Sequence, residues 1–113
     1  MNDCLFCKII AGEIPSTKIY EDDKVYAFLD IDPQAPFHAI VVPKEHIVSA
    51  ADITAQNSGY ISAIFEAIAK IAENEKLEKG FRVVNNCGED GGQTVGHIHF
   101  HLLARRYLQW PPG

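Results

Sequence analysis

The sequence lacks the features that mark secreted, membrane and nucleic-acid-binding proteins. It has only three cysteines, an odd number, and its polar N-terminus carries no export signal, so reduced or metal-bound thiols are expected rather than disulfides. No stretch approaches the roughly 18 to 20 apolar residues that a membrane-spanning helix needs. The 10 lysines and arginines are outnumbered by 15 aspartates and glutamates, which excludes a broad basic surface. We expect a cytoplasmic protein that binds neither membranes nor nucleic acids.

The length and the apolar pattern predict one α+β domain covering residues 1–113. An antiparallel sheet of about five strands, with one long helix and a short N-terminal helix, accounts for the pattern. Runs of β-branched and aromatic residues predict strands at 17–22, 24–31, 38–43, 81–85 and 97–104. Helices are predicted at 4–11 and 57–79, ended by Gly12 and Gly80.

The five histidines gather in two places. His38 and His46 flank a predicted strand, and the other three lie in the stretch HIHFHLL near the end of the chain. Because successive side chains of a strand point to opposite faces, His97, His99 and His101 are expected to share one face. A single histidine is usually a hydrogen-bonded or solvated ring, whereas three at every second position favour a functional site.

Two chemistries fit this row of histidines. Neutral imidazole is the commonest protein ligand for zinc, and it can also attack phosphorus while neighbouring rings hold the phosphate oxygens. The preceding loop favours the second chemistry, because its glycines let backbone N–H groups approach an anion and because Gln93 and Thr94 add donors. Asp30, beside Phe28 and Ile31, suits a ribose contact next to a base pocket, and it suits a turn equally well.

Several motifs together carry a resemblance to a known family. HIHFHLL has alternating histidines and apolar residues, and DIDPQAP, VVPKEHI and a terminal WPPG accompany it. Over nearly its whole length, except the middle of the long helix, the chain resembles the histidine triad (HIT) superfamily. It is most similar to the histidine triad nucleotide-binding (HINT) branch, the purine nucleoside phosphoramidases. The resemblance implies the HIT-like α+β fold.

The resemblance also implies a hydrolase. Its reaction is cleavage of the P–N bond of nucleoside 5′-phosphoramidates, as in adenosine 5′-monophosphoramidases, and of related acyl nucleotides, which releases AMP or GMP. By resemblance, His99 is the nucleophile that forms a transient nucleotidyl-histidine, and the backbone of His97 fixes its tautomer. His101 and His38 contact the phosphate oxygens, while His101 and Thr94 assist the leaving group. No catalytic cofactor is implied.

A nucleotide-binding set follows from the same resemblance. Asp30 holds the ribose and Gln93 faces the phosphate, while Asn86 stands where the family has a nucleotide-contacting asparagine. The walls of the base pocket are apolar: Leu5, Phe6, Phe28 and Ile31.

The N-terminal CLFC is a pair of cysteines with the spacing of metal ligands. Some members of the family bind zinc through such a pair and two histidines, which implies a closed structural site here. Its ligands are Cys4, Cys7, His46 and His97. The alternative is that the two cysteines are small buried thiols on a short helix, and Cys87 is expected to be a bystander.

The family forms homodimers that join the sheets through the long helix and a strand edge. An isolated five-stranded sheet would leave an edge and apolar surface exposed, so we predict a homodimer. Trp110 either reaches the partner's site or covers apolar surface.

The chain departs from the family's pattern at three places. Thr94 stands where many relatives have serine, and Gly96 stands where an aromatic residue is frequent; both changes could alter which leaving groups are preferred. Ala104-Arg105 replaces a common glycine pair and could alter the subunit contact or the loop beside the site.

Three other functions remain open at this point. One is hydrolysis of dinucleoside polyphosphates, which the WPPG ending disfavours. A second is a non-catalytic nucleotide-binding or interaction module that keeps the pocket. The third is a zinc enzyme with His97, His99 and His101 as ligands, which leaves His38 and the cysteine pair without a purpose.

Overall fold

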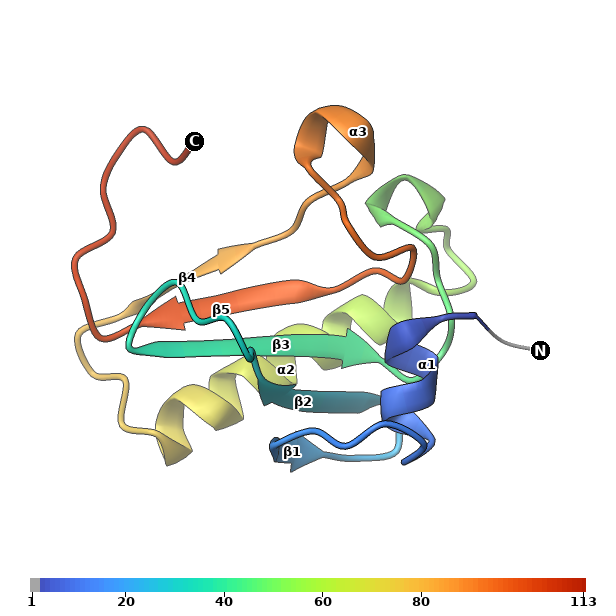
Figure 1. The fold of residues 1–113 in the computed structure, drawn as a ribbon, viewed down its shortest axis with the longest axis horizontal. Coiled ribbons are helices and arrows are strands. Elements are labelled where there is room, and N and C mark those ends of the chain that lie inside the picture. The colour runs from blue at the N-terminus through green and yellow to red at the C-terminus, as the bar shows by residue number, and fades with distance from the viewer. Residues whose placement is uncertain (1–2) are drawn as a thin grey trace.

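One antiparallel sheet with strand order β1-β2-β3-β5-β4 organises residues 3–113, the part of the chain that the computed structural model describes (Figure 1). The strands are β1 (Lys18–Glu21), β2 (Val25–Leu29), β3 (Phe37–Pro43), β4 (Phe81–Val84) and β5 (Phe100–Ala104). β2, β3 and β5 are inner strands, with β3 paired to β5, and β1 and β4 form the edges. The predicted α+β fold with an antiparallel five-stranded sheet is confirmed.

Two helices cover opposite faces of the sheet. In Figure 1 the long helix α2 (Ser58–Asn74) passes behind the sheet, and the short helix α1 (Leu5–Ile10) lies in front of its right-hand end. The face under α2 forms the larger core, built around Ile64, Ile68 and Ile71 of the helix. Within residues 3–113, no helix is long and apolar enough to cross a lipid bilayer.

The histidine-rich stretch alternates between these two faces. Ile98, Phe100 and Leu102 belong to the core beneath α2. The rings of His97 and His99 instead contact Phe6 of α1, with centroids 6.0 and 4.9 Å apart. The predicted division between a histidine face and an apolar face is therefore confirmed.

The boundaries of this strand differ from the prediction of 97–104. β5 begins only at Phe100, because the backbone bends before that residue and does not pair with β3 there. There the backbone N–H of Ile98 donates to the carbonyl of Ile47, beyond the end of β3, at 2.7 Å. This contact holds the segment in place without a strand ladder.

The long helix ends earlier than predicted. It stops at Asn74, and Lys76 takes the left-handed conformation directly after it, with φ of 58°. Gly80 also has positive φ, 97°, but it lies in the loop before β4 and does not end the helix. The N–H groups of Lys76 and Leu77 donate to the carbonyls of Glu73 and Ala72, which satisfies the last turn of the helix. Burial of Leu77 accompanies this ending and outweighs the preference for glycine.

Two short helical segments were not predicted. The 3₁₀ helix η1 (Ala50–Asp52) follows β3, and α3 (Gly88–Gly91) lies within the glycine-rich loop. Both are only three or four residues long and have no apolar periodicity that a sequence could reveal. The predicted end of the N-terminal helix is confirmed, since Gly12 has φ of 82°.

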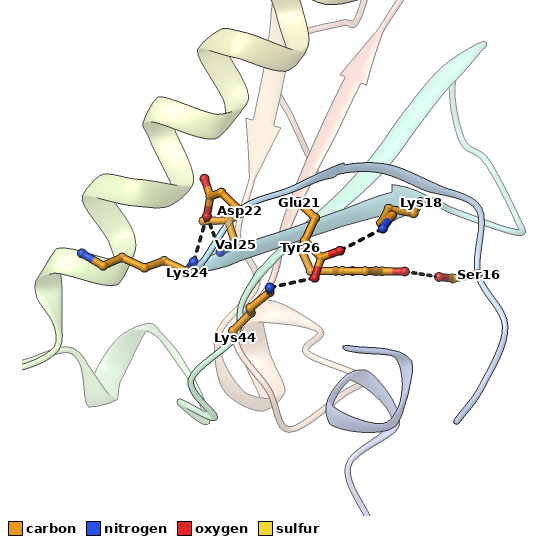
Figure 2. A network of polar contacts seen from close by, with 8 residues as sticks. All are labelled: Ser16, Lys18, Glu21, Asp22, Lys24, Val25, Tyr26 and Lys44. Carbon is orange, nitrogen blue, oxygen red and sulfur yellow. Dashed lines mark hydrogen bonds and ion pairs between the residues drawn. The ribbon is translucent and has the colours of Figure 1, made fainter. Parts of the chain in front are cut away.

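Polar contacts close the first hairpin and cover the β1 edge (Figure 2). The Asp22 carboxylate accepts the N–H groups of Lys24 and Val25 at 2.8 and 2.9 Å, which shapes the turn between β1 and β2. Glu21 bridges Lys18 at 2.9 Å and Lys44 at 2.7 Å. This edge is charged and presents lysine to solvent, a common protection against pairing with another sheet.

Candidate active site

Three imidazole rings from two neighbouring strands meet on the α1 face of the sheet. His101 lies on β5, His99 directly precedes it, and His38 lies on β3, which pairs with β5. The ring centroids are 5.2 Å apart for His99 and His101, and 5.1 Å apart for His38 and His101. His99 and His38 are only 4% and 5% exposed, so the sheet holds the rings in a largely dry setting.

His99 has a defined tautomer. Its Nδ1 lies 2.8 Å from the carbonyl oxygen of His97, and a carbonyl can only accept, so Nδ1 carries the proton. The lone pair of the neutral ring is then on Nε2. The Asn85 side chain donates to the carbonyl of His99 at 2.9 Å and fixes the backbone on the other side.

His38 and His101 form a second ordered pair. The backbone N–H of Gln34 donates to Nδ1 of His38 at 3.0 Å, so the proton of neutral His38 is on Nε2. That Nε2 lies 2.8 Å from Nδ1 of His101, which must accept, and His101 therefore carries its own proton on Nε2. Burial lowers the pKa of both rings below 6.5, which favours the neutral forms at neutral pH.

A cavity of about 300 Å³ lies against the rings of His99 and His101. Such a volume is at the small end of ligand pockets, and the walls are mostly apolar, as in pockets that hold a ring system. The predicted residues that line it are Leu5, Phe6, Phe28, Asp30, Ile31, Thr94, His99 and His101. The side chain of Ile31 is 100% exposed and stands at the rim. The prediction missed Ile9, Ile14 and Ile40, whose apolar character suits core and pocket equally.

Asp30 combines the two roles that the sequence left open. Its Oδ1 accepts the N–H of Asp32 at 2.8 Å, which is a turn contact. Its Oδ2 lies 3.4 Å from Nε2 of His38 and the residue lines the cavity. The carboxylate thus shapes the loop after β2 and also places negative charge beside the histidine pair.

The glycine-rich loop is held by Gln93. Its side-chain amide donates to the carbonyls of Val48 at 2.7 Å and Val95 at 2.9 Å, and its oxygen accepts the N–H of Gly88 at 3.0 Å. The structure therefore gives Gln93 a role in shaping the loop, and its phosphate contact stays a prediction. Asn86 lies beside the backbone of Gly91 rather than among the residues that line the cavity, so its nucleotide contact also stays a prediction.

Four sulfur and nitrogen donors converge beside the first turn of α1. Cys4 Sγ and Cys7 Sγ lie 3.4 and 3.5 Å from Nδ1 of His97, and Nδ1 of His46 lies 3.3 Å from Cys7 Sγ and 3.2 Å from Nδ1 of His97. All four donor atoms are within 4.8 Å of one another. A tetrahedral zinc ion separates its ligands by roughly 3.3–3.8 Å, so this set fits zinc.

The tautomer of His97 also suits a metal ligand. Its Nε2 lies 2.9 Å from the carbonyl oxygen of Pro43, so Nε2 carries the proton and Nδ1 offers a lone pair to the cysteine cluster. The ring is fully buried. His97 therefore contributes its ring to this cluster and only its backbone to His99, which separates it from the other two histidines of the row.

Comparison with known proteins agrees with this geometry. The HIT domain family model matches residues 11–108. The chain therefore belongs to the HIT domain family. Among HIT family structures, a hydrolase from Legionella pneumophila Philadelphia 1 superposes with a TM-score of 0.95 at 47% identity, covering 98% of this chain and 100% of that one. The predicted resemblance to the histidine triad superfamily is confirmed.

Two curated relatives of this HIT protein have informative names. A 14 kDa zinc-binding protein of Zea mays is 46% identical over 114 residues, which cover 96% of this chain and 87% of the relative. Adenylylsulfatase HINT1 of Arabidopsis thaliana is 41% identical over 111 residues, which cover 96% of this chain and 76% of the relative.

Proposed function

We propose that the protein hydrolyses purine nucleoside 5′-phosphoramidates and related acyl nucleotides to the nucleoside monophosphate, AMP or GMP, with His99 as the nucleophile. One observation carries this proposal. The Nδ1–H of His99 is donated to the carbonyl of His97, so the neutral form of this buried ring, which lines the cavity, has its lone pair on Nε2. A neutral imidazole held in this way is a competent nucleophile at pH 7.

The first step forms a bond from Nε2 of His99 to the α-phosphorus. The P–N bond of the substrate breaks and its electron pair goes to the leaving nitrogen, which takes the proton from Nε2 of His101 and departs as an amine. His38, 2.8 Å from Nδ1 of His101, can then supply its own Nε2 proton to that ring. Fixed donors of this kind meet negative charge as it develops.

The second step releases the nucleotide. A water oxygen bonds to phosphorus, the bond to His99 breaks and its electron pair returns to Nε2. One water proton goes to Nε2 of His101, whose Nδ1 proton returns to Nε2 of His38, and the other water proton stays with the product phosphate. The nucleotidyl-histidine therefore forms and decays with no net change in the protein.

Nucleotide binding follows from the walls of the cavity. Asp30 would hold the ribose hydroxyls, His38 and His101 the phosphate oxygens, and the apolar side the purine base, while Thr94 lies at the leaving-group end. Asn86 and Gln93 would add contacts from the loop. The adenylylsulfatase name of the Arabidopsis relative supports an adenylyl group as the nucleotide part.

Zinc is part of this proposal as a structural ion. Cys4, Cys7, His46 and His97 would hold it, as their spacing and the name of the maize relative support. A closed set of two thiolates and two imidazoles supplies stability and no open coordination position for chemistry. The residues of the chain alone supply the nucleophile and the donors.

A homodimer is proposed through the β4 edge. This edge strand exposes Phe81, while α2 exposes Phe65. A second copy pairing with β4 would cover both aromatic rings and extend the sheet.

The deciding experiment measures AMP release from adenosine 5′-phosphoramidate by the zinc-loaded protein. His99→Ala should lower kcat by at least about a thousandfold, because the covalent route is lost. AMP affinity, measured by calorimetry, should change only a few-fold. Absence of AMP release by the wild-type protein, or undiminished release by His99→Ala, would overturn the proposal, and tight AMP binding without turnover would identify a binding module.

A further inference from the structure

We propose that Arg106 and the backbone of Gln34 are positioning groups that make His101 offer a proton, rather than a lone pair, to the leaving group. This inference rests on the proposed function. Neither group touches the cavity or the reacting atoms, and both act through His38.

Two arrangements are open to a pair of neutral, hydrogen-bonded imidazoles. If Nε2 of His38 carries the proton, Nδ1 of His101 accepts it and Nε2–H of His101 is available to the leaving nitrogen. If the pair is reversed, His101 donates through Nδ1 and presents a bare lone pair. Only the first arrangement can protonate an amine as it departs.

The backbone N–H of Gln34 selects between them. It points at Nδ1 of His38 at 3.0 Å, and two N–H groups cannot face each other at that distance. The reversed arrangement would place a proton on the same Nδ1. Oδ2 of Asp30, 3.4 Å from Nε2 of His38, favours a proton on Nε2 as well. Both neighbours of His38 thus select the same tautomer.

Arg106 holds Gln34 in this position. Its Nε and Nη2 both donate to the carbonyl oxygen of Gln34, at 3.2 and 3.0 Å, although the two residues are 72 positions apart. The side chain of Gln34 donates to the carbonyl of Asp32 at 2.9 Å, and the N–H of Asp30 donates to the carbonyl of His38 at 2.9 Å. The guanidinium of Arg106, on the segment that follows β5, therefore anchors the exposed loop that contains Gln34.

The test compares two substrates whose leaving groups differ in their need for a proton. An alkylamine phosphoramidate of adenosine needs one at departure, and adenosine 5′-phosphorofluoridate does not. For Arg106→Ala we expect kcat to fall about fivefold with the phosphoramidate and to stay within about twofold with the fluoridate, at unchanged KM. Arg106→Lys should restore part of the loss. Arg82→Ala is the matched control, because Arg82 also donates to a backbone carbonyl, that of Leu108, and does not touch Gln34.

Equal losses on both substrates, or no loss on either, would overturn the proposal. Nitrogen-15 NMR of the histidines gives a second measurement that needs neither turnover nor a variant: Nδ1 of His38 should be unprotonated and Nε2 of His101 protonated. The reverse assignment would overturn the proposal. If the wild-type protein releases AMP from neither substrate, the proposed function fails, and the NMR assignment still decides between the two tautomers.

Discussion

The carbonyl oxygen of His97 accepts the Nδ1–H of His99 at 2.8 Å, while the ring of the same His97 faces the cysteine cluster. One residue therefore connects the proposed metal site to the proposed nucleophile. A change that shifts the backbone of His97 as its ring moves would also displace the carbonyl that sets the tautomer of His99. Stability and activity should respond together to loss of the metal.

Replacing Cys7 by serine should abolish stoichiometric zinc binding. Because zinc binds only the folded chain, its loss removes stabilisation of about 3–4 kcal/mol at zinc concentrations far above the dissociation constant. The midpoint of thermal unfolding should fall by roughly 10 °C or more. Metal content by mass spectrometry and calorimetric unfolding measure both effects.

Cys87→Ser is the matched control. Cys87 lies outside the group of four donors, so this variant should keep one zinc per chain and the wild-type unfolding temperature. Zinc retained by Cys7→Ser, or lost equally from both variants, would contradict the assigned ligands.

Stability should decrease as the pH falls through about 6.5. Burial lowers the pKa of His38 and His101 in the folded state, whereas both titrate near 6.5 in the unfolded chain. Below that pH the unfolded state binds protons that the folded state does not, so the free energy of unfolding declines until the folded rings also titrate. The contribution of these two rings should be constant above pH 7.5. Urea unfolding at pH 7.5, 6.5 and 5.5 measures this dependence.

Zinc release at low pH would give a similar trend, and the Cys7→Ser variant separates the two causes. It carries no zinc site, so its remaining decline between pH 7.5 and 5.5 belongs to buried histidines. A flat profile in this variant would show that the metal site alone causes the dependence.

Alanine and glycine at position 105 should differ in stability. Arg105 has φ of 74°, and it offsets this strain by donating to the carbonyl of Glu75 at the end of α2, at 2.9 Å, and by stacking over Phe37 at 5.1 Å. Arg105→Ala loses these contacts and keeps the strain, so we expect a loss of about 1–2 kcal/mol. Arg105→Gly should be more stable than Arg105→Ala by about 1 kcal/mol, because glycine adopts positive φ freely. Equal urea midpoints for Arg105→Ala and Arg105→Gly would contradict this explanation of the position, where the family commonly has glycine.

Phe81→Glu should convert the proposed dimer to a monomer. It places a charge at the start of the edge strand β4, where a second copy would pack. Lys18→Glu changes the charge at the start of the opposite edge strand, β1, and should leave the dimer intact. Sedimentation velocity measures the mass, and a wild-type protein with the mass of one chain would exclude the dimer.

Runs of β-branched and aromatic residues predicted the strands well, because the central strands β2 and β3 are buried along almost their whole length. The end of α2 could not be predicted in the same way. Gly80 has the conformational freedom to end a helix, yet the chain turns at Lys76 because Leu77 can then reach the core. The gain from burying one leucine is a property of the packed structure rather than of the local sequence.

The side chains of the site were easier to predict than the groups that orient them. Histidines and cysteines have distinctive spacing, and the structure brings together both the histidine group and the four residues proposed to bind zinc. Their tautomers depend on the carbonyls of Pro43 and His97 and the N–H of Gln34. Every residue has such backbone groups, so nothing in the sequence distinguishes these three.

Between Ile98 and Leu102, apolar core residues alternate with histidines, so the fold and the proposed chemistry depend on the same spacing. A one-codon insertion or deletion in this stretch would turn the imidazoles into the core and the apolar side chains toward the cavity. The same lesion would remove the fold and the reaction at once. Insertions and deletions should therefore be rare in this stretch during evolution. They should be more frequent where side chains do not alternate between the core and the cavity.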